Sequence, residues 1–361
     1  MRIREVFFHD FRSFQGPRCI SFLDPLTDSV RPITAIAGTN GTGKTTILEV
    51  IEAFLKYFTM GYPQPSFLAE LEESRGSVQI VVEIEKADLP FLDSSIKAEA
   101  PLCIYMAVGD REKLPKFAAA RHPPHSAALF SPSRTLSSSG LGSKLKEQAR
   151  HFSKHLVSLY GGLIYFPHHR QLTSKKGGPI QAPPEVNDWL FHYSSSDKWE
   201  GSLEQLWVWQ NYLDLEAQVL GQPAVNLKPF TETIEQMLGA KRSIWIERGR
   251  VWVTPPNDQY NGRAARVQLE ALPAGEQQLL LLVAELTRHR RKGAVIMIDE
   301  PELSLHPTLQ RQLLHYLRTF AREWDSQIIL ATHSLEILRA VHQSERLILD
   351  QLEEATNVSF N

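Results

Sequence analysis

Cysteine is scarce in this chain of 361 residues, which contains only Cys19 and Cys103. Two cysteines so far apart provide neither a disulfide framework nor a metal-binding spacing. Long apolar runs are also missing, since a stretch such as Leu279 to Ala284 is far shorter than the roughly 20 residues that cross a bilayer. The first residues contain no apolar signal core followed by a cleavage site. These absences favour a cytoplasmic protein that does not enter a membrane.

A surplus of charge of one sign is absent as well. The chain has 39 Lys and Arg residues against 41 Asp and Glu residues, a formal net charge of −2. This balance excludes the uniformly basic surface of a histone-like protein, although a local basic groove for DNA is compatible with it. Heptad arrays are missing, and prolines recur between residues 60 and 230, so no long coiled-coil arm is expected.

A glycine-rich segment that follows an apolar, β-branched stretch is the strongest motif. The pattern G-x-x-x-x-G-K-[ST] is matched without a mismatch by Gly38, Thr39, Asn40, Gly41, Thr42, Gly43, Lys44 and Thr45, and Thr46 comes next. After it, apolar residues recur at helical spacing as far as Phe58, which is the context that this motif requires. The glycines let backbone N–H groups surround a polyphosphate at the helix N-terminus. The motif predicts ATP binding, with Lys44 on the β- and γ-phosphates and the Thr45 hydroxyl on Mg²⁺.

Two acids end a second apolar strand near residues 295–298. They are Asp299 and Glu300, and ligands of open α/β sheets bind at the carboxyl ends of the strands. We predict that Asp299 positions Mg²⁺ and that Glu300 is the general base that polarises the attacking water. Adjacent acids also occur in solvated turns, but the phosphate loop in the same chain favours catalysis.

Two more segments are expected at this edge of the sheet. The apolar strand near residues 328–331 is followed by His333, which could hydrogen-bond the attacking water or sense the γ-phosphate, and by Ser334, which could cap the next helix. Gly275 and Glu276 open an apolar helix before the acidic strand, and a glycine at a helix start exposes backbone N–H groups to an anion.

In this order the four elements resemble the ATP-binding-cassette (ABC) ATPase superfamily, and more narrowly its RecF, SMC and OLD-type heads. Phe11-Arg-Ser-Phe14 resembles the N-F-R-S-F stretch of those heads, Asp299 to Pro307 their D-E-P-E-x-x-L-H-P run, and Ala331-Thr-His-Ser their switch. The resemblance implies an α/β fold, a P-loop NTPase with an ABC-ATPase-like head and a mixed sheet. Residues 1–58 and 263–361 would form the split ATPase core. Residues 59–262 would be an inserted α+β region, an antiparallel β lobe plus a helical insertion.

The resemblance also implies that two heads enclose two ATP molecules. The signature of one head, here Pro273 to Gln277, would complete the phosphate site of the other through Gly275 and Glu276. The usual signature serine aligns with Pro273, which has neither a hydroxyl nor an N–H group. Slow hydrolysis is therefore expected.

Two side chains are expected near the nucleotide on the same grounds. Arg12 would lie near the adenine, although a solvated turn residue fits its position equally. Gln171 or Arg170 follows a predicted buried strand, as the glutamine loop does in the family. One of these two would contact the γ-phosphate or Mg²⁺, unless the segment is an ordinary loop.

We therefore predict an ATPase that acts as a nucleotide-dependent dimerisation switch, the ATPase or sensor subunit of an antiphage defence system whose effector, such as a nuclease, is a separate protein. Residues 60–262 would hold that effector or build larger oligomers. A DNA-repair or DNA-maintenance ATPase that binds DNA directly is one alternative. A nucleotide-gated scaffold with negligible turnover is another. A transporter ATPase is disfavoured, because the acidic run and the N-terminal stretch do not fit it.

Overall fold

The computed structural model describes residues 1–56, 65–84, 102–113, 126–131, 134–140, 161–170, 182, 189–193, 203–238, 243–254 and 266–351. In chain order its strands and helices are β1 (Arg2–Phe11), β2 (Phe14–Ser21), β3 (Ile33–Ala37), α1 (Lys44–Leu55), α3 (Pro65–Ser74), β4 (Ser77–Ile84), β5 (Leu102–Gly109), β6 (Ser126–Ser131), β7 (Arg134–Gly140), β8 (Leu163–Phe166), β9 (Leu190–His192), α5 (Leu203–Val219), α6 (Lys228–Leu238), β10 (Ile244–Glu247), β11 (Arg250–Val253), β12 (Val267–Gln268), α7 (Ala274–Arg288), β13 (Val295–Asp299), α8 (Pro307–Glu323), β14 (Gln327–Thr332), α9 (Leu335–Ala340) and β15 (Arg346–Ile348). A single 3₁₀ turn, η6 (Leu349–Gln351), follows β15.

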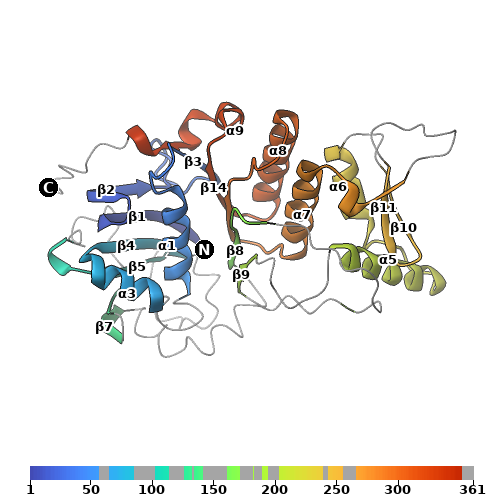
Figure 1. Cartoon of the computed structure of the whole chain (residues 1–361). Coiled ribbons are helices and arrows are strands. Elements are labelled where there is room, and N and C mark those ends of the chain that lie inside the picture. The colour runs from blue at the N-terminus through green and yellow to red at the C-terminus, as the bar shows by residue number, and fades with distance from the viewer. Residues whose placement is uncertain are drawn as a thin grey trace.

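The central sheet is parallel. Among the described residues its six strands have the order β15-β3-β14-β13-β8-β9. Successive side chains of a strand point to opposite faces, so Val295 and Met297 of β13 enter one hydrophobic cluster while Ile296 and Ile298 enter the other. A parallel sheet needs cover on both faces, and α1 covers one face here while α7 and α8 cover the other (Figure 1). The carboxyl ends of all these strands meet at one edge.

A second sheet lies beyond α1. Its order is β2-β1-β4-β5-β6-β7, and its described strand pairs are antiparallel except for β5 with β6. Side chains of β1, β4 and β5 share one hydrophobic cluster with α1, α3 and the near face of the central sheet. Helix α1 therefore packs between the two sheets (Figure 1). The phosphate loop that precedes α1 is held from both sides.

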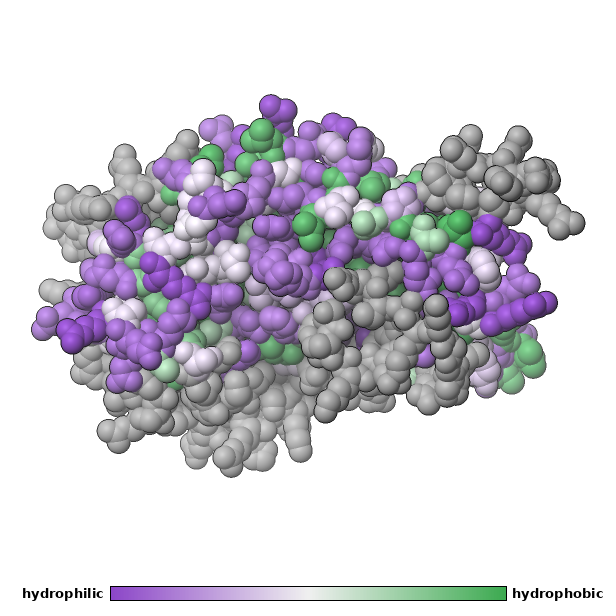
Figure 2. Space-filling view, viewed as in Figure 1, coloured by the Kyte–Doolittle hydropathy of each residue, from purple (hydrophilic) through white to green (hydrophobic). Residues whose placement is uncertain are grey.

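The far end of the molecule consists of α5, α6 and the β10–β11 hairpin, which pack on the α7 and α8 side of the central sheet (Figure 1). Trp207 of α5 is fully buried in that cluster. Tyr212, Leu215 and Val219 of the same helix are exposed at helical spacing. Figure 2 shows hydrophobic side chains at this end, and also in smaller groups elsewhere on a face that is mostly hydrophilic.

The P-loop NTPase fold that the sequence indicates is confirmed, and so is the mixed sheet, which is the second of the two large sheets. The division into an ATPase core (residues 1–58 and 263–361) and an inserted region (residues 59–262) stays a prediction. Each of the two large sheets contains strands from both parts. Strand β1 pairs with β4, and β8 and β9 belong to the central sheet. None of the described helices is both long enough and apolar enough to span a membrane.

Candidate nucleotide-binding site

The phosphate loop connects the end of β3 to the start of α1. Gly43, the residue before the helix, has φ 100°, in the left-handed region that favours glycine. A Cβ atom there would lie 2.6 Å from the ring of Phe14 in β2. The N-F-R-S-F-like stretch thus packs directly against the loop, and no residue larger than glycine fits at position 43.

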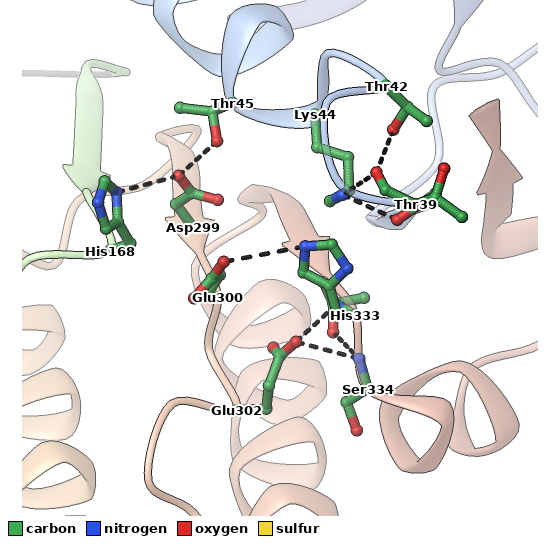
Figure 3. Close-up of polar contacts among 12 residues, drawn as sticks. Thr39, Thr42, Lys44, Thr45, His168, Asp299, Glu300, Glu302, His333 and Ser334 are labelled. Carbon is green, nitrogen blue, oxygen red and sulfur yellow. Dashed lines mark hydrogen bonds and ion pairs between the residues drawn. The ribbon is translucent and has the colours of Figure 1, made fainter. Parts of the chain in front are cut away.

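The side chain of Lys44 turns back over the loop (Figure 3). Its Nζ donates hydrogen bonds to the carbonyls of Gly38 at 2.8 Å and Thr39 at 2.9 Å, and the Thr42 hydroxyl also donates to Thr39 O at 2.9 Å. Burial lowers the pKa of Lys44, and the carboxylates of Asp299 and other nearby acids oppose that effect. The ammonium group therefore lies inside the loop, where phosphate oxygens would replace the two carbonyls as acceptors.

Asp299 ends β13 beside the first turn of α1. Its Oδ2 accepts a hydrogen bond from Thr45 Oγ1 at 2.9 Å, and His168 Nδ1 lies 3.7 Å from the same oxygen (Figure 3). The residue is only 2% exposed, and burial raises the pKa of its carboxyl group although the Thr45 hydroxyl opposes this. A hydroxyl and a carboxylate next to a phosphate loop are the oxygen ligands that Mg²⁺ takes, so this pair fits the ion.

The acid turn, which we define as residues 299–305, aims Glu300 at the end of β14. Glu300 has φ 48°, and its N–H donates to the carbonyl of Ala331 at 2.8 Å. His333 Nε2 lies 3.9 Å from Glu300 Oε1, and both side chains are about one-third exposed (Figure 3). A carboxylate and an imidazole that face each other beside Lys44 are suited to hold and deprotonate a water molecule.

Glu302 clamps the switch segment, a role that sequence reasoning missed. Its Oε1 accepts hydrogen bonds from the N–H groups of His333 at 2.6 Å and Ser334 at 3.0 Å (Figure 3). Ser334 in turn caps α9, since its hydroxyl accepts from the N–H groups of Glu336 and Ile337. The sequence had only one signal for this role, the position of Glu302 within the same acidic run as Glu300.

Arg170 lies beneath the acid turn. It is 2% exposed, and its guanidinium donates to the carbonyls of Pro167 and Asp299, both at 2.6 Å, and of Glu300 at 2.8 Å. These bonds turn Nη1 and Nη2 of Arg170 toward main-chain carbonyls, and the contact of Arg170 with the γ-phosphate or Mg²⁺ stays a prediction that this placement does not support. The other candidate of that pair, Gln171, lies outside the described residues.

Arg12 is paired with carboxylates. It forms ion pairs with Glu49 of α1 and, at 2.6 Å, with Glu70 of α3, and these bonds raise its pKa. Together with Thr45 and His168 it lines a cavity of about 410 Å³. The adenine contact of Arg12 stays a prediction, as do the nucleotide contacts of Asn40, Gly41 and Thr46 within the loop and first turn of α1.

Gly275 and Glu276 lie in the first turn of α7. Gly275 is buried, and a Cβ atom there would approach the carbonyl oxygen of Ser304 to 2.4 Å, so this glycine lets α7 touch the acid turn. Glu276 is half-buried beside it. Their contact with the nucleotide of a second head stays a prediction.

Asp350 is a second residue that sequence reasoning missed, and no motif indicated it. Its carboxylate accepts hydrogen bonds from the N–H and the hydroxyl of Thr39, each at 3.0 Å. Leu349 packs close to Gly38 in the same place. The turn η6 therefore touches the start of the phosphate loop.

Two family models match parts of the chain. Residues 254–339 match a model described as "AAA domain, putative AbiEii toxin, Type IV TA system", and residues 5–88 match one described as "AAA domain". No curated protein shows a significant match.

Solved SMC heads match over nearly the whole chain. An Smc head bound to the C-winged helix domain of ScpA is 13% identical, with a TM-score of 0.50, and the match covers 94% of this chain and 93% of that chain. The SMC head domain from Thermotoga maritima is 14% identical, with a TM-score of 0.44 and coverages of 94% and 92%. An Smc head with an extended coiled coil, bound to the C-terminal domain of ScpA derived from Pyrococcus furiosus, is 13% identical, with a TM-score of 0.47 and coverages of 94% and 91%.

Proposed function

We propose that this protein, which has the fold of an ABC-type ATPase head of the RecF and SMC group, binds ATP with Mg²⁺. ATP brings two heads together, and slow hydrolysis to ADP and phosphate separates them. The observation that supports this most strongly is the convergence of five side chains at one sheet edge, namely Lys44, Thr45, Asp299, Glu300 and His333.

Each of these residues has a separate task in the proposed reaction. Lys44 binds the β- and γ-phosphates, while Thr45 and Asp299 hold Mg²⁺, which when bound neutralises phosphate charge. Glu300 accepts a proton from the attacking water. The oxygen of that water bonds to the γ-phosphorus while the bond between the γ-phosphorus and the ADP oxygen breaks. His333 orients that water.

The proposed dimer places α7 of one head on the nucleotide of the other. The N-terminus of a helix carries a partial positive charge and free N–H groups, so it is suited to the γ-phosphate of a partner. Pro273 precedes this helix and provides no side-chain cap. The head-to-head dimer, or a larger oligomer built from it, therefore has fewer bonds to the nucleotide than a dimer with serine at position 273 would have.

The biological role that we propose is the sensor subunit of an antiphage defence system with a separate effector such as a nuclease. The match of residues 254–339 to a model named for the AbiEii toxin supports it. A domain of ScpA binds the Smc head in one of the similar structures, so a head of this fold can hold a protein partner.

Glu300→Gln tests the switch. This nearly isosteric change removes the base, so we expect unchanged ATP affinity, turnover lowered about 10²–10⁴-fold and a dimer or larger species with ATP and Mg²⁺ in light scattering. Lys44→Ala is the control, and it should neither bind ATP nor dimerise. A monomeric mass for Glu300→Gln at high protein concentration contradicts the sandwich.

Two further assays on the same proteins distinguish the other roles. Salt-dependent DNA binding that ATP strengthens would identify a DNA-maintenance ATPase. ATP-dependent dimerisation without measurable turnover would identify a scaffold.

A further inference from the structure

Helix α7 contacts the acid turn directly at one point and through Arg170 at another. Its first turn meets the carbonyl of Ser304 at Gly275, where a side chain would not fit. One turn later, Gln278 Nε2 donates to the carbonyl of Arg170 at 2.7 Å, and Arg170 Nε lies within hydrogen-bond distance of Gln278 Oε1 at 3.4 Å. The helix that would receive the partner's nucleotide is thus in contact with the turn that bears the general base.

Arg170 is the link between the two. Its fork of N–H groups holds three carbonyls, two of which belong to Asp299 and Glu300. Burying a guanidinium is unfavourable unless its donors are used, and burial accordingly lowers the pKa of Arg170. Arg170 donates to the carbonyls of two adjoining residues, Asp299 and Glu300, rather than to a carboxylate. These contacts therefore fix the path of the backbone in the acid turn.

That backbone has an uncommon conformation. Glu300 and Ser304 have φ values of 48° and 63°, in the left-handed region that non-glycine residues rarely adopt. Such residues persist only where the surrounding structure determines them. Glu300 has its N–H bonded to Ala331 and its carbonyl bonded to Arg170, so both peptide groups beside the general base are held.

We propose that Arg170 and Gln278 are positioning residues that couple the N-terminus of α7 to Glu300, so that a nucleotide bound by the partner head aligns the base of this head. The inference rests on the proposed function, in which α7 meets that nucleotide. When α7 moves, Gln278 moves Arg170, and Arg170 moves the carbonyls on which the direction of the Glu300 carboxylate depends.

Hydrogen–deuterium exchange in the absence of nucleotide tests the physical link. Gln278→Leu removes both bonds to Arg170 but keeps the volume of the side chain. We expect faster exchange over residues 299–305 than in the parent protein. Thr287→Val is the matched control, because it removes a side-chain hydrogen bond between α7 and Tyr316 at the other end of the helix. Equal exchange in the two variants overturns the link.

Turnover tests the role of the link. Gln278→Leu should keep the parental ATP affinity, and in the Glu300→Gln background it should keep ATP-induced dimerisation. Its kcat should fall about tenfold or more, because a small misplacement of a reacting group has effects of that size. Thr287→Val should keep the parental kcat. A parental kcat in Gln278→Leu overturns the coupling.

Arg170→Lys separates geometry from charge. Lysine keeps the positive charge but cannot hold three carbonyls in a planar fork, so we expect kcat to fall as in Gln278→Leu. A parental kcat in Arg170→Lys overturns the positioning role. If the parent protein neither binds ATP nor dimerises, the proposed function fails, whereas the exchange experiment still decides whether Gln278 holds the acid turn.

Discussion

The charges around Lys44 show how single residues set the affinity of the loop. The ammonium group lies among several carboxylates, and Asp350 is one of those that favour its charged form. Asp350 also occupies the N–H group of Thr39 at the start of the loop. A carboxylate in that place repels a polyphosphate and uses a donor that the nucleotide could employ. We therefore expect it to compete with ATP.

We expect Asp350→Asn to bind ATP more tightly. The change keeps an acceptor for Thr39 but removes the negative charge, and an exposed charge of this kind corresponds to about a two- to fivefold change in affinity. Equilibrium binding at low ionic strength measures the effect, which added salt should diminish. Asp325→Asn is the control, since Asp325 pairs with Arg2 at the opposite edge of the central sheet. Weaker binding by Asp350→Asn would instead show that its bonds to Thr39 pre-organise the loop.

The placement of residues at the candidate site was predictable where a local motif carries them. Lys44 and Thr45 belong to one contiguous motif. Glu300 was predicted to lie at the sheet edge because it directly follows an apolar strand. Asp350 is 311 residues from Thr39, and Arg170 is 129 residues from Asp299. No spacing within a single segment indicates contacts of that kind, which arise only when the parallel strands are placed side by side.

At the scale of elements, α9 and the acid turn form one unit. Glu302 accepts the two N–H groups that precede α9, and Ser334 caps the helix itself. N–H groups at the start of a helix have no partner within the helix, so a carboxylate there both satisfies them and fixes the chain that enters the helix. The orientation of the His333 ring toward Glu300 consequently depends on Glu302.

Glu302→Ala should slow hydrolysis about tenfold while the affinity for ATP stays within a factor of two. The reason is that the N–H group of His333 loses its acceptor and that of Ser334 keeps only Thr332 Oγ1, so the imidazole is no longer held toward Glu300, whereas the phosphate loop is untouched. Steady-state turnover with equilibrium ATP binding measures both quantities. Glu302→Gln, which keeps an oxygen acceptor, should recover much of the rate. Glu336→Ala removes only a surface pair with Arg311 and should leave the rate unchanged. Parental turnover in Glu302→Ala contradicts the role of the clamp.

Strands were easier to predict than their neighbours in a sheet. The apolar run at β8 indicates a buried strand, yet its sequence cannot show that it pairs with β13 inside the central sheet. Likewise β1 pairs with β4 through residues such as Val6 and Ile80, which lie far apart in the sequence. Periodicity specifies which side chains are buried, whereas pairing depends on long-range packing that no single segment contains.

At the scale of the whole molecule, the proposed second head would face one surface, formed by the phosphate loop, the acid turn and the start of α7. In our proposal the coupling from α7 through Gln278 and Arg170 makes catalysis in each head depend on the other. Contact with the partner's nucleotide then completes the alignment of the base in this proposal, and the ATP-bound dimer is the form that hydrolyses. Turnover is then limited by how well α7 contacts the partner's nucleotide.

Pro273 sets that limit in our proposal, and it leads to the last prediction. Basal turnover should be near or below about 1 s⁻¹, the low end of typical enzyme rates. Pro273→Ser restores a hydroxyl and an N–H group before α7, at a position where serine also caps a helix well. We expect kcat to rise several-fold, and adding Glu300→Gln should abolish the gain. A parental rate of hundreds per second without a partner, or no gain in Pro273→Ser, would show that Pro273 does not limit the reaction.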